Sequence, residues 1–265
     1  YPQYHIYNLD ILSYAGNLDN LTDLKNNENY TFIEGDICDN ELIKNIFKKY
    51  KISRVIHLAA ESHVDRSITN PFSFAQTNVM GTLNLLQVAK ESWQGNYINK
   101  LFYHISTDEV YGSLGLLGKF TEETPYDPSS PYSASKAASD MLVRAYYRTY
   151  KTKVTLSNCS NNYGSHQFPE KLIPLMVTNA IDDIPLPVYG DGQQVREWMH
   201  VDDHARGIDL VLRNGVPGKA YNLGSGCERV NLDVVKGILA ALGKPDTLIR
   251  NVQDRPGHDR RYLME

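Results

Sequence analysis

Short apolar runs alternate with amphipathic stretches along the first part of the chain. Four runs rich in β-branched and aromatic residues predict strands: "YHIYNLD", "YTFIEGD", "SRVIHLAA" and "LFYHIST". Between them, "NELIKNIFKKY" places its apolar residues at helical spacing, and residues 71–92 are expected to form a long helix. Nearly continuous apolar strands separated by helices are typical of a parallel sheet that is covered on both faces.

This pattern weakens after about residue 160, where proline and glycine become denser, as in "IPLPVYGDG" and "NGVPGKAYNLGSG". We therefore expect an α/β protein in which residues 1–160 form a Rossmann-type, doubly wound parallel sheet. Residues 161–265 are expected to form a smaller, mixed α/β substrate-binding portion that is partly interleaved with the first.

Composition narrows the class of protein. Of 265 residues, 42% are hydrophobic and 22% are charged, as in an ordinary globular protein. The net charge of −4 offers no basic surface for nucleic acid, and no apolar run approaches the ~18 residues of a membrane span. Three scattered cysteines predict neither a disulfide framework nor a zinc site, and favour the cytoplasm. His200 and His204 stand four apart without a third ligand, so no metal is expected.

Small or polar residues follow each of the four predicted strands, at the edge where open parallel sheets bind ligands. They are Asp10, "GDICD", "LAAESHVD" and "STDE". An acid such as Asp10 binds the adenosine ribose of NAD in dinucleotide folds, about 20 residues after a Gly-rich loop. No G-x-G-x-x-G loop occurs in the chain, so its first strand and loop are expected to precede Tyr1. Without that context, Asp10 is equally well explained as a turn residue.

"PYSASK" places Tyr132 and Lys136 four residues apart at the start of an amphipathic stretch, so both side chains can face one cleft. A phenol has a pKa near ~10 and must lose ~3 units to act as a base at neutral pH. A cation about 4 Å away supplies roughly that much in a medium of effective dielectric about 20, and the positive nicotinamide of NAD⁺ would add to it. The pair alone is weak evidence, but it gains weight from Ser106 and Thr107 at a strand end upstream.

Several long motifs resemble the extended short-chain dehydrogenase/reductase superfamily and, within it, the dTDP-glucose 4,6-dehydratase family. They run from Asp10 to Tyr262 and include "HLAAESHVDRSI", "HISTDEVYG", "PYSASKAASD", "QFPEKLIPL" and "DRPGHDRRY". The Gly-rich start and the C-terminal helices of that family are not in the chain. The resemblance implies a cytoplasmic homodimer that makes a 4-keto-6-deoxy sugar, usually for rhamnose or related glycans.

The resemblance also implies catalytic roles for Thr107, Asp108, Glu109, Tyr132 and Lys136. NAD oxidises the sugar at C4 while Tyr132 takes the hydroxyl proton and Thr107 binds the same oxygen. Glu109 then removes the C5 proton, protonated Asp108 releases the C6 hydroxyl as water, and hydride returns to C6. Two close carboxyls suit these roles, because they cannot both ionise cheaply. Neighbours on a straight strand face opposite ways, so the backbone is expected to turn at Thr107.

Further residues are assigned by resemblance alone. The cofactor is expected at Asp10, Asp36, Ile37, Leu58, Ala59, Ala60, Thr77, Tyr132, Lys136 and Asn162. The nucleotide sugar is expected at Ser62, Thr107, Asn161, Lys171, Leu172, Pro187, Val188, Tyr189, Arg196, Asn222, Arg255 and His258. Cationic side chains fit a diphosphate, which an Arg fork binds through two hydrogen bonds.

Other readings remain open from the sequence. A bare Asp-Glu pair is most often part of a solvated loop. Nucleotide-sugar 4-epimerases and decarboxylases share the fold and the Tyr/Lys pair, and UDP- or CDP-sugar 4,6-dehydratases share the chemistry. A cofactor-binding regulator without catalysis is a third possibility, against which the intact catalytic set argues. Asp108 and Glu109 separate the first two, because epimerisation at C4 needs no acid and base at C5 and C6.

Overall fold

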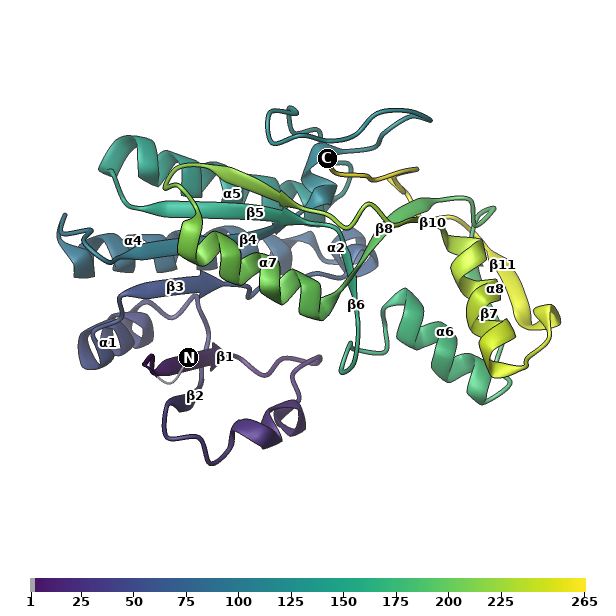
Figure 1. The fold of residues 1–265 in the computed structure, drawn as a ribbon, viewed down its shortest axis with the longest axis horizontal. Helices are drawn as coiled ribbons and strands as arrows, with labels where there is room; N and C mark the ends of the chain where they lie inside the picture. Colours follow the sequence, from purple (N-terminus) through teal and green to yellow (C-terminus); the bar gives the residue numbers. More distant parts are fainter. Residues whose placement is uncertain (1–2) are drawn as a thin grey trace.

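The structure is a computed structural model that describes residues 3–265. Its largest sheet has four parallel strands in the order β3-β4-β5-β9, and a second parallel pair joins β1 to β2 (Figure 1). The strands are β1 Ile6–Asp10, β2 Tyr30–Glu34, β3 Arg54–His57, β4 Leu101–Thr107, β5 Val154–Cys159 and β9 Ala220–Leu223. The four predicted strands and the predicted α/β fold class are therefore confirmed.

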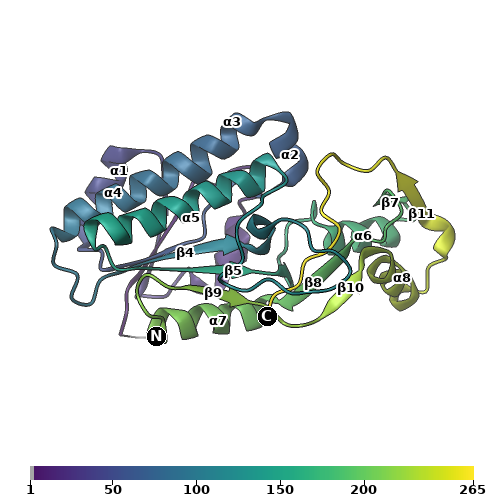
Figure 2. The same ribbon diagram turned by 90° about the horizontal axis from the view of Figure 1, so that it is seen from above.

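Helices cover both faces of the large sheet. α1 Asn40–Tyr50, α4 Thr82–Trp93 and α5 Pro131–Tyr150 lie on one face, and α7 Val201–Asn214 lies on the other (Figure 2). α1 begins where the Asp39 side chain accepts a hydrogen bond from the Leu42 N–H, as expected for a polar N-cap residue. Both faces of β4 are consequently buried, which explains its unbroken apolar pattern.

The long helix predicted over residues 71–92 is present, but its geometry changes along its length. It consists of α3 Pro71–Phe74, a π-helical segment η2 at Ala75–Gly81, and α4. Within η2, the buried Asn78 amide bonds both the N–H and the carbonyl of Glu61, and donates to Ser135 Oγ at 2.8 Å. π-Helical turns are frequent at functional sites, and this one anchors the loop that follows β3.

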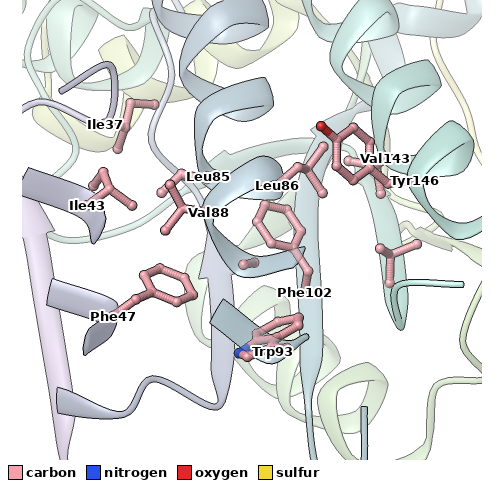
Figure 3. Packing of buried hydrophobic residues seen from close by; sticks show 12 residues of the cluster. Ile37, Ile43, Phe47, Leu85, Leu86, Val88, Trp93, Phe102, Val143 and Tyr146 are labelled. Carbon is pink, nitrogen blue, oxygen red and sulfur yellow. The ribbon is translucent and has the colours of Figure 1, made fainter. Parts of the chain in front are cut away.

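The main apolar core lies between the large sheet and helices α1, α4 and α5 (Figure 3). Leu86 and Val88 of α4 are fully buried, and Phe102 of β4 packs beside them under Val143 of α5. Burial of such side chains is worth about 1.5–3 kcal/mol each relative to exposure. The core thus holds the carboxyl end of β4 in a fixed position relative to α5.

Replacing Leu86 with Ala is expected to lower the free energy of unfolding by about 2–5 kcal/mol, because the cavity cannot fully collapse. Urea denaturation followed by circular dichroism measures this loss. The matched variant Leu116→Ala alters a leucine that is 94% exposed and should change stability by less than about 0.5 kcal/mol. Equal losses in the two variants would contradict this account of the core.

The remaining elements form a smaller body beside the large sheet (Figure 1). β6, β8 and β10 make a mixed sheet, and β7 pairs in parallel with β11. Their bounds are β6 Asn161–Tyr163, β7 Leu186–Tyr189, β8 Val195–His200, β10 Glu228–Val230 and β11 Ile249–Val252. α6 Leu172–Ile181 and α8 Asn231–Leu242 pack on β7. Because β9 and α7 return to the large sheet, the chain after residue 160 contributes to both bodies.

Four short helical segments complete the described part of the chain, together with the long connection between η3 and α5: η1 Leu18–Leu24, α2 Val64–Thr69, η3 Asp108–Tyr111 and η4 Asp246–Leu248. Within residues 3–265, no helix combines the length and the apolar character needed to cross a membrane.

Candidate active site

The chain turns out of β4 immediately after Thr107, as predicted. Thr107 Oγ1 accepts a hydrogen bond from the Glu109 N–H at 3.3 Å and caps η3, the short helix that starts at Asp108. The same hydroxyl donates to Asp108 Oδ1 at 3.2 Å. Asp108 is buried and Glu109 is partly buried, so neither belongs to a solvated acidic loop.

The two carboxyls have different surroundings. Burial raises the pKa of Asp108 well above its usual range, and the charge of Glu109 raises it further. Burial also raises the pKa of Glu109, but the Arg255 and Arg196 guanidiniums oppose that rise. Asp108 Oδ2 has no hydrogen-bond partner among the described residues, which leaves it available to a ligand. The rise is the stronger one at Asp108, so of the two carboxyls Asp108 is the one that favours its protonated form.

The raised pKa of Asp108 has a consequence for stability. The folded protein keeps a proton that the unfolded chain releases, so the free energy of unfolding falls as pH rises from the ordinary aspartate pKa through the higher folded one. Asn cannot ionise, so Asp108→Asn should gain stability relative to wild type across that window. Chemical denaturation at a series of pH values measures the difference.

Asp191 provides the control of opposite sign. Its hydrogen bonds with Arg260 lower its pKa, so its stabilisation is present above the ordinary aspartate pKa and is lost as pH falls. Asp191→Asn should therefore lose stability relative to wild type as pH rises through the acidic range. A pH-independent difference for Asp108→Asn would contradict the raised pKa.

Tyr132 and Lys136 lie in the first two turns of α5, as the spacing predicted. Ser130 caps this helix through reciprocal hydrogen bonds with Ser133, and Pro131 occupies its first turn. The cap fixes where the helix begins and thus which face carries the pair. Both side chains are buried, and Lys136 Nζ donates to the Ile105 carbonyl oxygen at 2.8 Å.

The surroundings of Tyr132 oppose its ionisation in the unliganded protein. Burial raises the pKa of Tyr132 well above its usual range, the charge of Glu109 adds to the rise, and a hydrogen bond with Thr107 opposes it. Lys136 donates its described hydrogen bond to the Ile105 carbonyl oxygen. The roles of Lys136 and of a bound cofactor in lowering this pKa therefore stay predictions.

Most of the residues expected to hold NAD lie at or just after the carboxyl ends of β1, β2 and β3. Asp10 Oδ1 accepts from the Leu12 N–H at 2.7 Å, and Asp36 Oδ1 accepts from the Cys38 N–H at 2.8 Å. Each aspartate therefore shapes its own turn and keeps its second oxygen for other contacts. The others are Ile37, which is buried, the loop residues Leu58, Ala59 and Ala60, Thr77 in η2, and Asn162 in β6.

Unpartnered polar atoms indicate that a polar ligand fits here. Ser160 Oγ and Asn162 Oδ1 are buried and lack a hydrogen-bond partner among the described residues. Buried polar atoms are normally satisfied, so such atoms point to a missing partner. Asn162 is held in place by its Nδ2, which donates to the Ser160 carbonyl at 3.0 Å. These residues fit a dinucleotide. Within residues 3–265, no cluster of three or more His, Cys, Asp or Glu side chains could hold a metal ion.

The structure brings most of the predicted substrate residues around Glu109 and Asp65. Lys171 Nζ donates to the Ser62 carbonyl at 3.0 Å, and the charges of Lys171, Arg196 and Arg255 all act on Glu109. Arg196 Nη2 donates to the Asp259 carbonyl at 2.9 Å. These cations come from different segments and converge beside the carboxyl pair, as binding of a diphosphate requires.

Two aspartates, Asp65 and Asp254, contact Tyr189, Arg255 and His258 of the predicted substrate residues. Tyr189 OH donates to Asp65 Oδ2 at 2.8 Å, and Arg255 Nη1 lies 3.6 Å from Asp65 Oδ1. His258 Nδ1 lies 2.6 Å from Asp254 Oδ1. The remaining predicted residues are Asn161, whose Oδ1 is buried and unpartnered within the described chain, Leu172 at the start of α6, and Pro187 and Val188 in β7. Val188 is buried in the core between β7 and α8, so its side chain does not face a ligand.

Asn222 is not brought to this group. Its Oδ1 accepts from Tyr111 OH at 2.8 Å, and its Nδ2 donates to the Phe120 carbonyl at 3.2 Å. Its backbone N–H donates to Glu122 Oε1 at 2.9 Å. With these bonds made, Asn222 ties β9 to the segment around Phe120, and the structure does not support its assignment to the diphosphate.

Asn231 is a better candidate that sequence reasoning missed. It is the first residue of α8, it is buried, and its Oδ1 has no partner among the described residues. Its backbone N–H donates to the Gln194 carbonyl at 2.9 Å, and the buried Gln194 Oε1 is likewise unpartnered within the described chain. A lone Asn before an apolar helix reads in sequence as a helix start, so only the orphaned oxygen reveals it.

Comparison with known proteins gives a consistent result. The family model described as GDP-mannose 4,6 dehydratase matches residues 1–265. The dTDP-glucose 4,6-dehydratase of Neisseria gonorrhoeae is 53% identical over 276 residues, which cover 98% of this chain and 80% of that protein. The Escherichia coli dTDP-glucose 4,6-dehydratase is 51% identical over 284 residues, covering 98% of this chain and 78% of that protein.

Solved structures agree. DesIV, a dTDP-glucose 4,6-dehydratase from Streptomyces venezuelae solved with NAD bound, superposes with a TM-score of 0.94 at 47% identity, covering 98% of this chain and 79% of that chain. The UDP-glucose 4-epimerase of Thermus thermophilus, with NAD, reaches a TM-score of 0.87 at 25% identity, covering 98% and 82%. The fold is thus shared with epimerases, while the higher identity is to dehydratases. The chain belongs to the GDP-mannose 4,6 dehydratase family and, within it, to the dTDP-glucose 4,6-dehydratases.

Proposed function

We propose that the protein is a hydro-lyase that converts dTDP-D-glucose to dTDP-4-keto-6-deoxy-D-glucose and water, with NAD as a bound cofactor. The observation that carries the proposal is the carboxyl pair in one capped turn at the end of β4. Asp108 is buried and favours its protonated form, while Glu109 faces Lys171, Arg196 and Arg255. Removal of water across C5 and C6 needs such an acid and such a base.

The first task of the side chains is proton removal at the sugar C4 hydroxyl. Tyr132 is the group that would take this proton, and Thr107, which is hydrogen-bonded to Tyr132, would bind the same oxygen. Lys136 donates to the Ile105 carbonyl oxygen and lies one helical turn from Tyr132, where its charge can act on the phenol. Bound NAD⁺ would supply a hydride acceptor for C4, would return that hydride to C6 once reduced to NADH, and would add a positive charge near Tyr132.

The second task is elimination. A ketone at C4 acidifies the C5 hydrogen, and Glu109 is the base that would remove it. Asp108 would donate its proton to the C6 oxygen, so that the C6–O bond breaks and water leaves. Because Thr107 Oγ1 bonds both Asp108 Oδ1 and the Glu109 N–H, one hydroxyl fixes the geometry of acid and base together. Such fixed positioning is worth several orders of magnitude in rate.

The site residues of the nucleotide are also part of the proposal. Lys171, Arg196 and Arg255 would bind the diphosphate, with Asn161 and Asn231 offering amide groups to the sugar nucleotide. Asp10, Asp36 and Asn162 would bind the cofactor. We further propose a cytoplasmic homodimer: Cys38, Cys159 and Cys227 are free thiols, and Met141 and Tyr150 expose apolar surface on α5. Sedimentation of the full-length protein at monomer mass would contradict the dimer.

The decisive experiment incubates the full-length protein with NAD⁺ and dTDP-glucose, and measures the 4-keto-6-deoxy product by its absorbance in alkali. UDP-glucose and GDP-mannose are run in parallel to test the base. We expect product from dTDP-glucose at the highest kcat/KM. Formation of a 4-epimer without elimination would instead favour the epimerase reading, and faster turnover of another nucleotide sugar would change the assigned substrate.

A further inference from the structure

Helix α5 carries a third polar residue on the face of Tyr132 and Lys136. Asp140 follows Lys136 by four residues, as Lys136 follows Tyr132, so the three lie in one row along the helix. Asp140 is completely buried. It is also attached to β4, because Ser106 Oγ donates to its Oδ2 at 2.9 Å. Ile105 and Ser106, which are consecutive in β4, therefore bind Lys136 and Asp140, which are neighbours in this row.

Asp140 is surrounded by hydrogen-bond donors. Tyr126 OH donates to its Oδ2 at 2.9 Å, so this oxygen receives two hydrogen bonds. His104 Nε2 lies 3.2 Å from Oδ1, and both side chains are fully buried. Arg144, one turn further along α5, contacts Tyr126 OH at 3.3 Å. Two neutral donors on one oxygen suit a carboxylate anion, which accepts but does not donate.

Lys136 faces few groups that could balance its charge. Three titratable side chains on the neighbouring strands interact with it: His57 of β3, His104 of β4 and Cys159 of β5. Burial lowers the pKa of His57 and the pKa of His104, so these rings are neutral at neutral pH. Burial raises the pKa of Cys159 to about 12, so its thiol is neutral as well.

Of the two side chains that favour the charged form of Lys136, Asp140 and Cys159, Asp140 is the carboxyl and has the larger effect. Burial lowers the pKa of Lys136, and the charge of Asp140 is the largest influence that opposes this change. A buried ammonium without a counter-charge loses its proton rather than bear the cost of desolvation. The lysine has a single described hydrogen bond, to a neutral carbonyl, so its charge depends on a nearby anion.

We propose that Asp140 is a positioning residue of the active site, whose carboxylate keeps the buried Lys136 ammonium charged so that Lys136 can act on Tyr132. The inference rests on the proposed function and deepens it. Asp140 touches neither the sugar nor the cofactor in this role. Ser106 and Tyr126 hold the carboxylate, whose charge acts on Lys136 one helical turn away and through Lys136 on Tyr132.

The test is the pH dependence of kcat for the full-length enzyme with saturating NAD⁺ and dTDP-glucose. In Asp140→Asn, Lys136 should lose its proton at lower pH. The alkaline limb of the profile is expected to move toward neutral pH by about one unit or more. Asp140→Ser removes the same charge with a smaller side chain, and the same displacement is expected. Asp140→Glu restores a carboxylate and should return the limb most of the way to its wild-type position.

Tyr126→Phe is the matched control, because it removes one donor to Asp140 and leaves the carboxylate in place. Its alkaline limb should stay near that of wild type. A uniform loss of kcat in Asp140→Asn and Asp140→Ser, with the limb unmoved, would mean a structural role and overturn the proposal. The wild-type assay distinguishes a failure of the proposed function from a failure of this inference. If the wild type forms no product from dTDP-glucose, both are overturned. If the wild type turns over normally and the alkaline limb of the Asp140 variants does not move, only the role of Asp140 is overturned.

Discussion

Replacing Glu109 with Gln is expected to lower kcat of the full-length enzyme on dTDP-glucose by about 10²–10⁴-fold, the usual contribution of a positioned general base. The amide keeps the size of the side chain and its hydrogen-bonded backbone but cannot accept the C5 proton. Arg196 and Arg255, which balance the carboxylate charge, remain in place. The loss should therefore fall on kcat more than on KM.

Two measurements make this prediction specific. The product that Glu109→Gln still forms in D₂O should carry deuterium at C5. Mass spectrometry should show that this labelled product accumulates at the same reduced rate as total product. Glu123→Gln, a change at an exposed acid in the loop after η3, should retain wild-type turnover. If Glu109→Gln turns over as fast as the Glu123 variant, Glu109 is not the base.

Replacing Tyr132 with Phe is expected to reduce kcat by a similar factor, about 10²–10⁴-fold, because it removes the phenol that is proposed to take the C4 proton. The change removes one oxygen from a buried side chain that packs against Phe74, so the fold should persist. Steady-state kinetics with dTDP-glucose measures the loss, and circular dichroism verifies the fold.

Tyr146→Phe supplies the matched control on the same helix. It also deletes a buried hydroxyl, which donates to Gln87 Oε1 at 2.8 Å, and should cost about 1 kcal/mol of stability. Its kcat should equal that of wild type, since Tyr146 belongs to the apolar core. A comparable loss of activity in both variants would show that α5 responds to any lost hydroxyl, and would remove the special role of Tyr132.

The sequence predicted the elements whose signals are local. β4 is one unbroken buried run, and the Tyr132–Lys136 spacing is a property of a single helix, so both could be read without any structure. The turn after Thr107 was also predictable, because two catalytic carboxyls cannot share one face of a straight strand. The π-helical segment at Ala75–Gly81 was not, since the long-range bonds of Asn78 to Glu61 and Ser135 produce it.

The failures concern residues whose partners are distant in the chain. Asn222 and Asn231 are both asparagines next to apolar segments, and only their hydrogen bonds distinguish a satisfied amide from an orphaned one. Burial raises the pKa of Tyr132, and this effect depends on the whole packed site, so the spacing of Tyr132 and Lys136 does not reveal it. Spacing shows which groups can meet, whereas solvation decides which protonation state they adopt.

The placement of β9 has a consequence for how the protein is made. β5 ends at Cys159, but its outer neighbour β9 is Ala220–Leu223, with β6, β7, β8 and two helices synthesised in between. While the ribosome translates this interval, the finished strands β3, β4 and β5 carry an open edge with unpaired N–H and carbonyl groups, a template for pairing with other chains. The nascent protein is thus most exposed to aggregation after its apolar core is already encoded, and a pause in translation before residue 220 would prolong that period.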